Sequence, residues 1–335
     1  MLNKVQEKSY KLIQEDARFV YTLTKAFKGS NAPKSNYIMM LQPYIGLFAD
    51  GSEQWGQKVK ISTLAFSDDE KTHYTEMRNS IKLFDMTYDE LHAALKNKLD
   101  ESDKHFYDIR TLRSKLCGLY YNVGADLQGD TFCGNTILCS IYVPFYKFND
   151  SQYGEYIKNT SIVAGKLAAA YIDSEVQPYC TNDSLAFRYE DYHFFRKCPP
   201  DIKNYDDFLL FSILCNLNFV RIFINKYFID EFPAKLRYAY LQYYYLTNLI
   251  PQINQKLATD FTINCQYKNH KFRNCMAHYG LGMALKETDI IENDMLLGLS
   301  SKLLGMPYIE IKTAIYSELD MLSKQLTTHL LVPPL

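Results

Sequence analysis

Several motifs that would identify a metal or cofactor enzyme are missing from this chain of 335 residues. The eight cysteines form no Cys-x-x-Cys pair, and no two histidines stand four residues apart beside a glutamate, so a zinc site is not expected. The Gly-x-x-x-x-Gly-Lys-Ser/Thr sequence of phosphate-binding loops is also absent, which argues against ATP or GTP hydrolysis. We therefore expect no metal ion and no cofactor.

The sequence also lacks an excess of charge of one sign. Lys and Arg number 37 against 38 Asp and Glu, so a nucleic acid could be bound only by a local basic patch. No apolar segment typical of a signal peptide follows Met1. The most apolar window, residues 208–228, contains Asn216, Asn218 and Arg221, and a membrane-spanning helix rarely tolerates three such polar residues. We interpret the cysteines as buried thiols of a reducing compartment. The sequence thus predicts a cytoplasmic protein without membrane contact.

Helical periodicity dominates the first two hundred residues. Ser67 and Thr87 are each followed by Glu three positions later, which predicts two helices that begin with capping boxes. Apolar residues at helical spacing predict further helices over residues 4–28, 102–127 and 155–172. Short apolar runs are typical of strands, and we place strands at residues 58–66 and 136–145.

The remainder of the chain predicts a helical bundle. Pro199 and Pro200 exclude a helix, so we place a domain boundary there, between a mostly helical domain with a few short strands (residues 1–198) and a second domain (residues 201–330). Five apolar patterns in the second domain predict an antiparallel bundle of helices at residues 205–227, 234–250, 268–285, 290–304 and 308–326. The fold class is therefore mainly α.

The stretch from residue 271 to residue 280 combines side chains that bind phosphate and move protons. Asn274 and His278 are four residues apart and share one face of a helix, and the long side chain of Arg273 can reach the same edge. A histidine can move protons during attack of a ribose 2′-OH on the adjacent phosphate, and an arginine can stabilise the charge that develops there. One helix cannot surround a phosphate, so two copies meeting across a two-fold axis would complete the site.

Arg273 is preceded by three basic residues: Lys268, His270 and Lys271. They are candidates for an RNA-binding surface beside Arg273. The other interpretation is an ordinary solvated helix start, although cations are not favoured at that end of a helix dipole.

The sequence from Arg273 to His278 resembles the signature of the HEPN superfamily (higher eukaryote and prokaryote nucleotide-binding domains), which is Arg, a polar residue, three to five further residues and His in a four- or five-helix bundle. The resemblance covers residues 201–326. It implies a metal-independent endoribonuclease acting on RNA as a homodimer, with Arg273, Asn274 and His278 as catalytic residues. Such enzymes often serve as toxins or phage-defence effectors, which implies an antitoxin or other regulatory protein as a partner.

Other interpretations stay open at this point. The stretch from Arg188 to His193 has the same Arg-to-His spacing, but it lacks the Asn and lies in an irregular aromatic region, so we discount it. The bundle could instead be a non-catalytic RNA- or nucleotide-binding sensor, or a helical scaffold for protein interaction. The N-terminal domain has no catalytic motif, and we expect it to regulate or target the nuclease.

Overall fold

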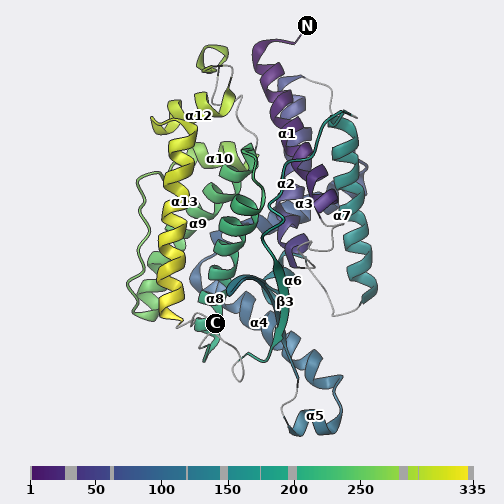
Figure 1. Ribbon diagram of the computed structural model, residues 1–335, viewed down its shortest axis with the longest axis vertical. Helices are drawn as coiled ribbons and strands as arrows, with labels where there is room; N and C mark the ends of the chain where they lie inside the picture. Colours follow the sequence, from purple (N-terminus) through teal and green to yellow (C-terminus); the bar gives the residue numbers. More distant parts are fainter. Residues whose placement is uncertain are drawn as a thin grey trace.

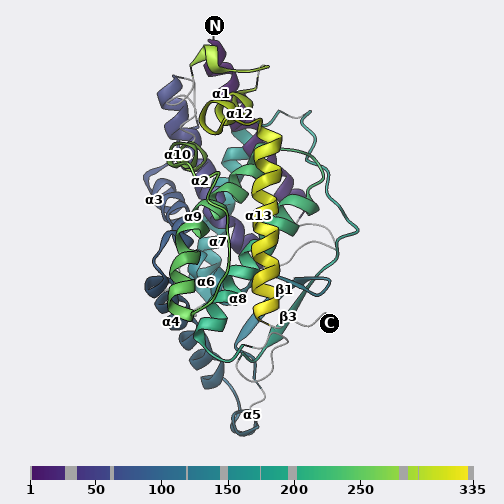
Figure 2. The same cartoon turned by 90° about the vertical axis from the view of Figure 1, so that its left-hand side faces the viewer.

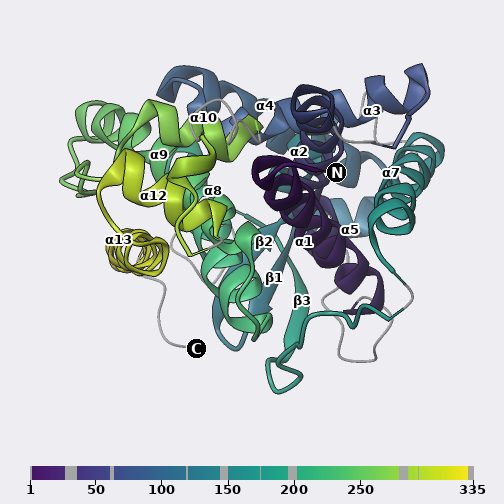
Figure 3. The ribbon, with the colours of Figure 1, turned by 90° about the horizontal axis from the view of Figure 1, so that it is seen from above.

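The computed structural model describes residues 2–26, 36–60, 64–117, 120–143, 150–173, 175–194, 202–278, 286–292 and 294–330. These residues are mainly helical and carry one small sheet (Figure 1), so the predicted mainly α fold class is confirmed. Helices from the two ends of the chain form two groups, with the sheet between them when the molecule is viewed along its long axis (Figure 3).

The first half of the chain supplies seven of the described α-helices. Ser67 and Thr87 each accept a hydrogen bond from the backbone N–H of the Glu three residues later, and each Glu bonds back, so both predicted capping boxes are confirmed. The bounds are α1 (Lys4–Ala26), α2 (Asn36–Val59), α3 (Asp68–Asn79), the 3-10 helix η1 (Ser80–Asp85), α4 (Tyr88–Asp108), α5 (Leu112–Leu116), α6 (Thr136–Tyr142) and α7 (Asp150–Tyr171). The predicted helices over residues 4–28 and 155–172 are confirmed where the structure describes them.

The sheet has the order β2-β1-β3, with antiparallel pairing throughout, and consists of β1 (Val123–Gln128), β2 (Thr131–Asn135) and β3 (Phe187–Tyr192). The prediction of one helix over residues 102–127 is wrong, because β1 pairs with β3 from a segment about sixty residues away. Gly129, with φ of +56°, makes the tight turn into β2. This pairing is a tertiary contact that local periodicity does not reveal.

Both predicted strands are wrong. Residues 136–142 form α6 because the Asn135 side chain caps it, accepting a hydrogen bond of 2.8 Å from the Leu138 N–H; residues 144–145 lie outside the described part. Residues 58 and 59 end α2, while residues 61–63 are not described and residues 64–66 form no strand. The helix α2 continues through Gly51 and Gly56 because this segment is buried, with Trp55 only 1% exposed.

The second half is helical at all five predicted segments. The first is α8 (Tyr205–Asn218), which continues as the π-helix η2 (Phe219–Tyr227); the others are α9 (Pro233–Leu257), α10 (His270–His278), α12 (Met295–Leu304) and α13 (Tyr308–His329), with the short 3-10 helix η3 (Glu287–Asp289) before α12. Pro251 lies inside α9 and does not end it, since the helix continues to Leu257 and a left-handed Ala258. Residues 279–285 of the third predicted helix lie outside the described part. Helix α13 runs along the long axis of the molecule (Figure 2).

The two halves of the chain share one core. Tyr44 of α2 stacks on Tyr238 of α9, and Asp16 of α1 forms an ion pair of 2.5 Å with Arg237 of α9 although both side chains are at most 2% exposed. The predicted boundary at Pro199 and Pro200 lies outside the described residues, so the division into two domains stays a prediction. These contacts nevertheless fix α1 and α2 against α9.

Helix Tyr205–Tyr227 is long and apolar enough to cross a membrane by length and composition, with a mean hydropathy of 1.7. In the fold, 89% of that apolar window is buried, as is expected for a central core helix.

The prediction that all cysteines are buried is wrong for Cys117, Cys180 and Cys265, which are exposed. The buried cysteines are Cys133, Cys139, Cys215 and Cys275, and Cys198 lies outside the described residues.

Candidate functional site

Helix α10 is anchored at its start by Asn269. The Asn269 side chain accepts a hydrogen bond of 3.0 Å from the Phe272 N–H and donates one of 3.0 Å to the Leu303 carbonyl of α12. Its backbone N–H donates to the Tyr240 hydroxyl of α9. On the inner face of α10, Phe272, Cys275, Met276 and Ala277 are buried. The polar residues of α10 therefore sit on a helix that both neighbouring helices hold in place.

Arg273 is held by contacts with α9, with η1 and with its own helix. Its Nη2 donates a hydrogen bond of 3.0 Å to the Tyr245 hydroxyl and lies 3.5 Å from Oδ2 of Asp85, while its Nη1 donates one of 3.0 Å to Oδ1 of Asn274. Its guanidinium carbon also lies 5.3 Å from the centre of the Tyr245 ring and 5.8 Å from that of Tyr244. The side chain is 13% exposed, and its Nε–H has no hydrogen-bond partner among the described residues.

Asn274 links Arg273 to a histidine that the spacing did not assign to catalysis. Its Nδ2 lies 3.3 Å from Nδ1 of His270, one helical turn earlier. Because the Asn274 amide nitrogen is a donor, Nδ1 of His270 accepts, and the neutral ring then carries its proton on Nε2. His278 is the last residue of α10, one turn after Asn274, but its side chain lies outside the described part. The structure thus brings Arg273, Asn274 and His270 together.

One of the predicted RNA-binding residues, His270, belongs to this cluster, and the other two are Lys268 and Lys271. Lys268 donates a hydrogen bond of 2.5 Å to Oδ1 of Asn248, and its Nζ lies 5.9 Å from the centre of the Tyr244 ring. His270 and Lys271 are exposed. A cationic surface beside Arg273, and RNA binding by it, remain predictions.

Two groups at the site were missed from the sequence alone. The run of three tyrosines that contains Tyr244 and Tyr245 is visible in the printed sequence, but only the packing of α9 against α10 places their rings at Arg273. Asp85, at the end of η1, gave no signal, since its segment is nearly two hundred residues away in the chain. An aspartate beside Arg273 reduces the net positive charge of the site.

Burial decides the protonation of two neighbouring groups. Burial raises the pKa of Tyr245, an effect that the charge of Arg273 only partly offsets, so the phenol stays neutral and can accept the arginine's hydrogen bond. Burial also raises the pKa of Cys275 to about 11, so its thiol is protonated at neutral pH and is not a candidate nucleophile.

The second Arg-to-His stretch is engaged elsewhere. Arg188 forms ion pairs with Asp130 and Glu190 on the sheet surface, and the buried His193 donates a hydrogen bond of 2.9 Å from Nδ1 to the Phe194 carbonyl. The expectation that this stretch is irregular is wrong, because Phe187–Tyr192 forms β3 and pairs with β1, and the contacts of Arg188 and His193 are structural.

Within the described ranges, no three His, Cys, Asp or Glu side chains come together in a group that could hold a metal ion. Comparisons with protein-family models, curated proteins and solved structures found no match for this chain. The residues of α10 and their contacts are therefore the basis for a functional proposal.

Proposed function

We propose that the C-terminal helices form a HEPN-like bundle and that α10 carries the active site of a metal-independent endoribonuclease. The observation that supports this most is the fixed position of Arg273. Tyr245 and Asn274 hold its guanidinium at the polar face of α10, close to His270 and to the cationic residues Lys268 and Lys271. A preorganised cation needs no rearrangement when charge develops on a phosphate.

The chemistry follows from these residue types. A base, His278 in this proposal, removes the proton of a ribose 2′-OH as that oxygen attacks the adjacent phosphorus. The bond from phosphorus to the 5′-oxygen breaks, and a second histidine protonates the leaving oxygen. Arg273 stabilises the charge on the phosphorane, and Asn274 orients the groups around it. The products are a 2′,3′-cyclic phosphate and a 5′-hydroxyl, and no step requires a metal ion.

The second histidine would come from a second copy of the chain. Two α10 helices across a two-fold axis would place two Arg273 and two His278 residues around one phosphate. As part of the same proposal, residues 1–198 regulate or target the nuclease, which acts in the cytoplasm as a toxin or phage-defence effector controlled by a regulatory protein or antitoxin.

The experiment is cleavage of a mixed RNA pool in the presence of EDTA. We expect the wild-type protein to cut RNA, and the His278→Ala and Arg273→Ala variants to lose about a hundredfold or more in rate, as expected when a proton-transfer group or a charge-stabilising group is removed. His329→Ala, a substitution at an exposed histidine of α13, is the matched control and should cut like the wild type. Circular dichroism of each variant checks that the fold is retained.

Equal cleavage by the wild-type and His278→Ala proteins would refute the proposed site. If neither protein cuts RNA, the second candidate function is favoured, which is RNA binding without catalysis. It is supported by the low exposure of Arg273 and by the bonds that its guanidinium already makes. In that case Lys271→Ala should weaken RNA binding, and neither the wild-type protein nor any variant should cut RNA.

A further inference from the structure

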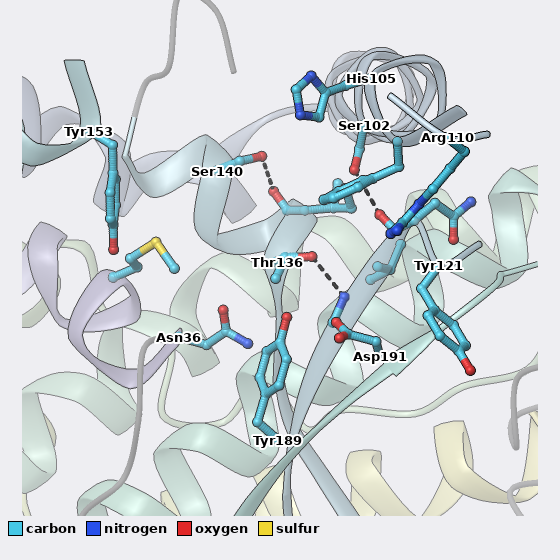
Figure 4. A pocket seen from close by; sticks show the side chains of 16 residues that line it. Asn36, Ser102, His105, Arg110, Tyr121, Thr136, Ser140, Tyr153, Tyr189 and Asp191 are labelled. Carbon is cyan, nitrogen blue, oxygen red and sulfur yellow. Dashed lines mark hydrogen bonds between the residues drawn. The ribbon is translucent and has the colours of Figure 1, made fainter. Parts of the chain in front are cut away.

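A cavity of about 450 Å³ lies away from α10, among residues of the first two hundred. It is enclosed by the end of α4, by β1 and β3, by α6 and by the first residues of α2, with Tyr153 of α7 at one side (Figure 4). None of its lining residues belongs to α8, α9, α10, α12 or α13. It is therefore a second site candidate, independent of the proposed nuclease.

Asn36 provides a buried polar group in the wall of this cavity. It is 0% exposed, and its amide forms no hydrogen bond of ordinary geometry among the described residues, although the buried Asp126 carboxyl lies near enough for the amide to lower its pKa. Figure 4 shows the Asn36 amide and the Tyr189 hydroxyl directed toward the same space. A buried amide without a full set of hydrogen bonds is unfavourable, so an amide in this position points to a ligand that bonds with it.

The chemistry of Asn36 restricts that ligand. A carboxamide presents a donor beside an acceptor, and its natural complement is a flat edge with an acceptor beside a donor. Nucleobases carry such edges, and asparagine pairs with them through two hydrogen bonds. The amide therefore favours a base over a simple sugar or an acyl chain.

Tyr189 gives the cavity an aromatic wall. A Cβ added to Gly124 of β1 would lie 1.8 Å from the Tyr189 hydroxyl oxygen, so glycine at this position leaves the space that the ring occupies. Phe106 and Tyr153 add further aromatic surface to the lining. Aromatic side chains of this kind stack on nucleobases.

The rim of the cavity carries an unpaired cation. Arg110 is exposed at the end of α4, and its guanidinium points into the cavity (Figure 4). It makes no hydrogen bond or ion pair with other described side chains, unlike Arg273 or Arg237. A guanidinium fork matches the oxygens of a phosphate. The Asp191 carboxylate, close to the Tyr189 hydroxyl, can accept hydrogen bonds from ribose hydroxyls.

We propose that this cavity binds a nucleoside monophosphate, with the base edge on Asn36, the base stacked on Tyr189 and the phosphate on Arg110. The volume is within the range of about 300–1,000 Å³ that is usual for small-molecule sites. The inference does not depend on RNA cleavage by α10.

Isothermal titration calorimetry of the full chain tests this inference. AMP, GMP, CMP and UMP are titrated separately, and ribose 5-phosphate, inorganic phosphate and adenosine are the partial ligands. We expect at least one nucleotide to bind at least about tenfold more tightly than every partial ligand, because a base contact and a phosphate contact each contribute. The titration measures nucleotide binding and not RNA cleavage, so failure of the nuclease proposal leaves this inference intact.

Two substitutions identify the site. Arg110→Ala should weaken nucleotide binding by about tenfold or more through loss of charge-assisted hydrogen bonds, whereas Arg113→Ala, at an exposed arginine of α5 outside the cavity, should bind like the wild type. Tyr189→Ala should also weaken binding, and Tyr189 is 40% exposed, so its truncation is compatible with folding. The inference is overturned if no nucleotide binds, if phosphate or ribose 5-phosphate binds as tightly as the nucleotides, or if Arg110→Ala and Arg113→Ala bind alike.

Discussion

Asp126 makes the stability of this fold depend on pH. It lies on β1 with 2% exposure, and Oδ2 has no hydrogen-bond partner in the described part of the chain. Burial raises the pKa of this carboxyl to about 8, and the nearby Asn36 amide lowers it only in part. The folded protein therefore holds a proton on Asp126 that the unfolded chain releases near pH 4. The resulting stability is fully present below that pH and is lost as pH rises toward about 8.

The size of the effect follows from the linkage between proton binding and folding. Between the unfolded and the folded pKa, each pH unit costs about 1.4 kcal/mol of unfolding free energy, so this one carboxyl should cost about 3 kcal/mol between about pH 5 and about pH 7. Asp126→Asn replaces the protonated acid by a neutral amide of the same shape. Between about pH 5 and about pH 7, the unfolding free energy of the variant should therefore fall by about 3 kcal/mol less than that of the wild type.

Urea unfolding followed by circular dichroism measures this difference. The wild type and Asp126→Asn are compared at each pH, and Asp130→Asn, at an exposed position in the adjacent turn, controls for the change in net charge. A free-energy difference between wild type and Asp126→Asn that stays constant from about pH 5 to about pH 7 would refute the assignment of a buried, protonated carboxyl.

Two further predictions concern α9. Burial lowers the pKa of Lys235, whose Nζ donates to the Phe228 carbonyl, to about 8, so the folded state binds fewer protons than the unfolded chain between about pH 8 and about pH 10.5. Wild-type stability should therefore rise relative to Lys235→Met over that range, and parallel melting temperatures for the two proteins would contradict this. Tyr245→Phe removes the acceptor of the Arg273 hydrogen bond and should lower the unfolding free energy by about 1–3 kcal/mol. It should also slow RNA cleavage by letting Arg273 move, and an unchanged cleavage rate would show that this bond does not position it.

Features coded by neighbouring residues could be predicted from the sequence. Ser67 and Thr87 cap their helices through hydrogen bonds with a Glu three residues later in the sequence. The long helices α1, α7 and α13 each have apolar residues at helical spacing within their own segment. The polar face of α10, with Arg273 and Asn274, could also be predicted, because helical spacing alone places its side chains.

Features coded by distant residues could not be predicted. Strand β1 exists because β3 pairs with it, and α6 exists because Asn135 caps a run that is otherwise as apolar as a strand. The same reason applies to the site, where Asp85 reaches Arg273 only in the folded chain. Asn36 looks like an ordinary polar residue in the sequence, and only the folded chain shows that it is buried in the wall of a cavity.

The most direct test of the central claim compares one labelled RNA strand with the same strand made of deoxynucleotides, in EDTA, with the wild-type protein. Cleavage by a 2′-OH attack at the α10 site predicts that only the RNA is cut and that its 5′ fragment ends in a 2′,3′-cyclic phosphate. Cleavage of both strands, or RNA fragments that end in a 3′-hydroxyl, would contradict the proposed reaction.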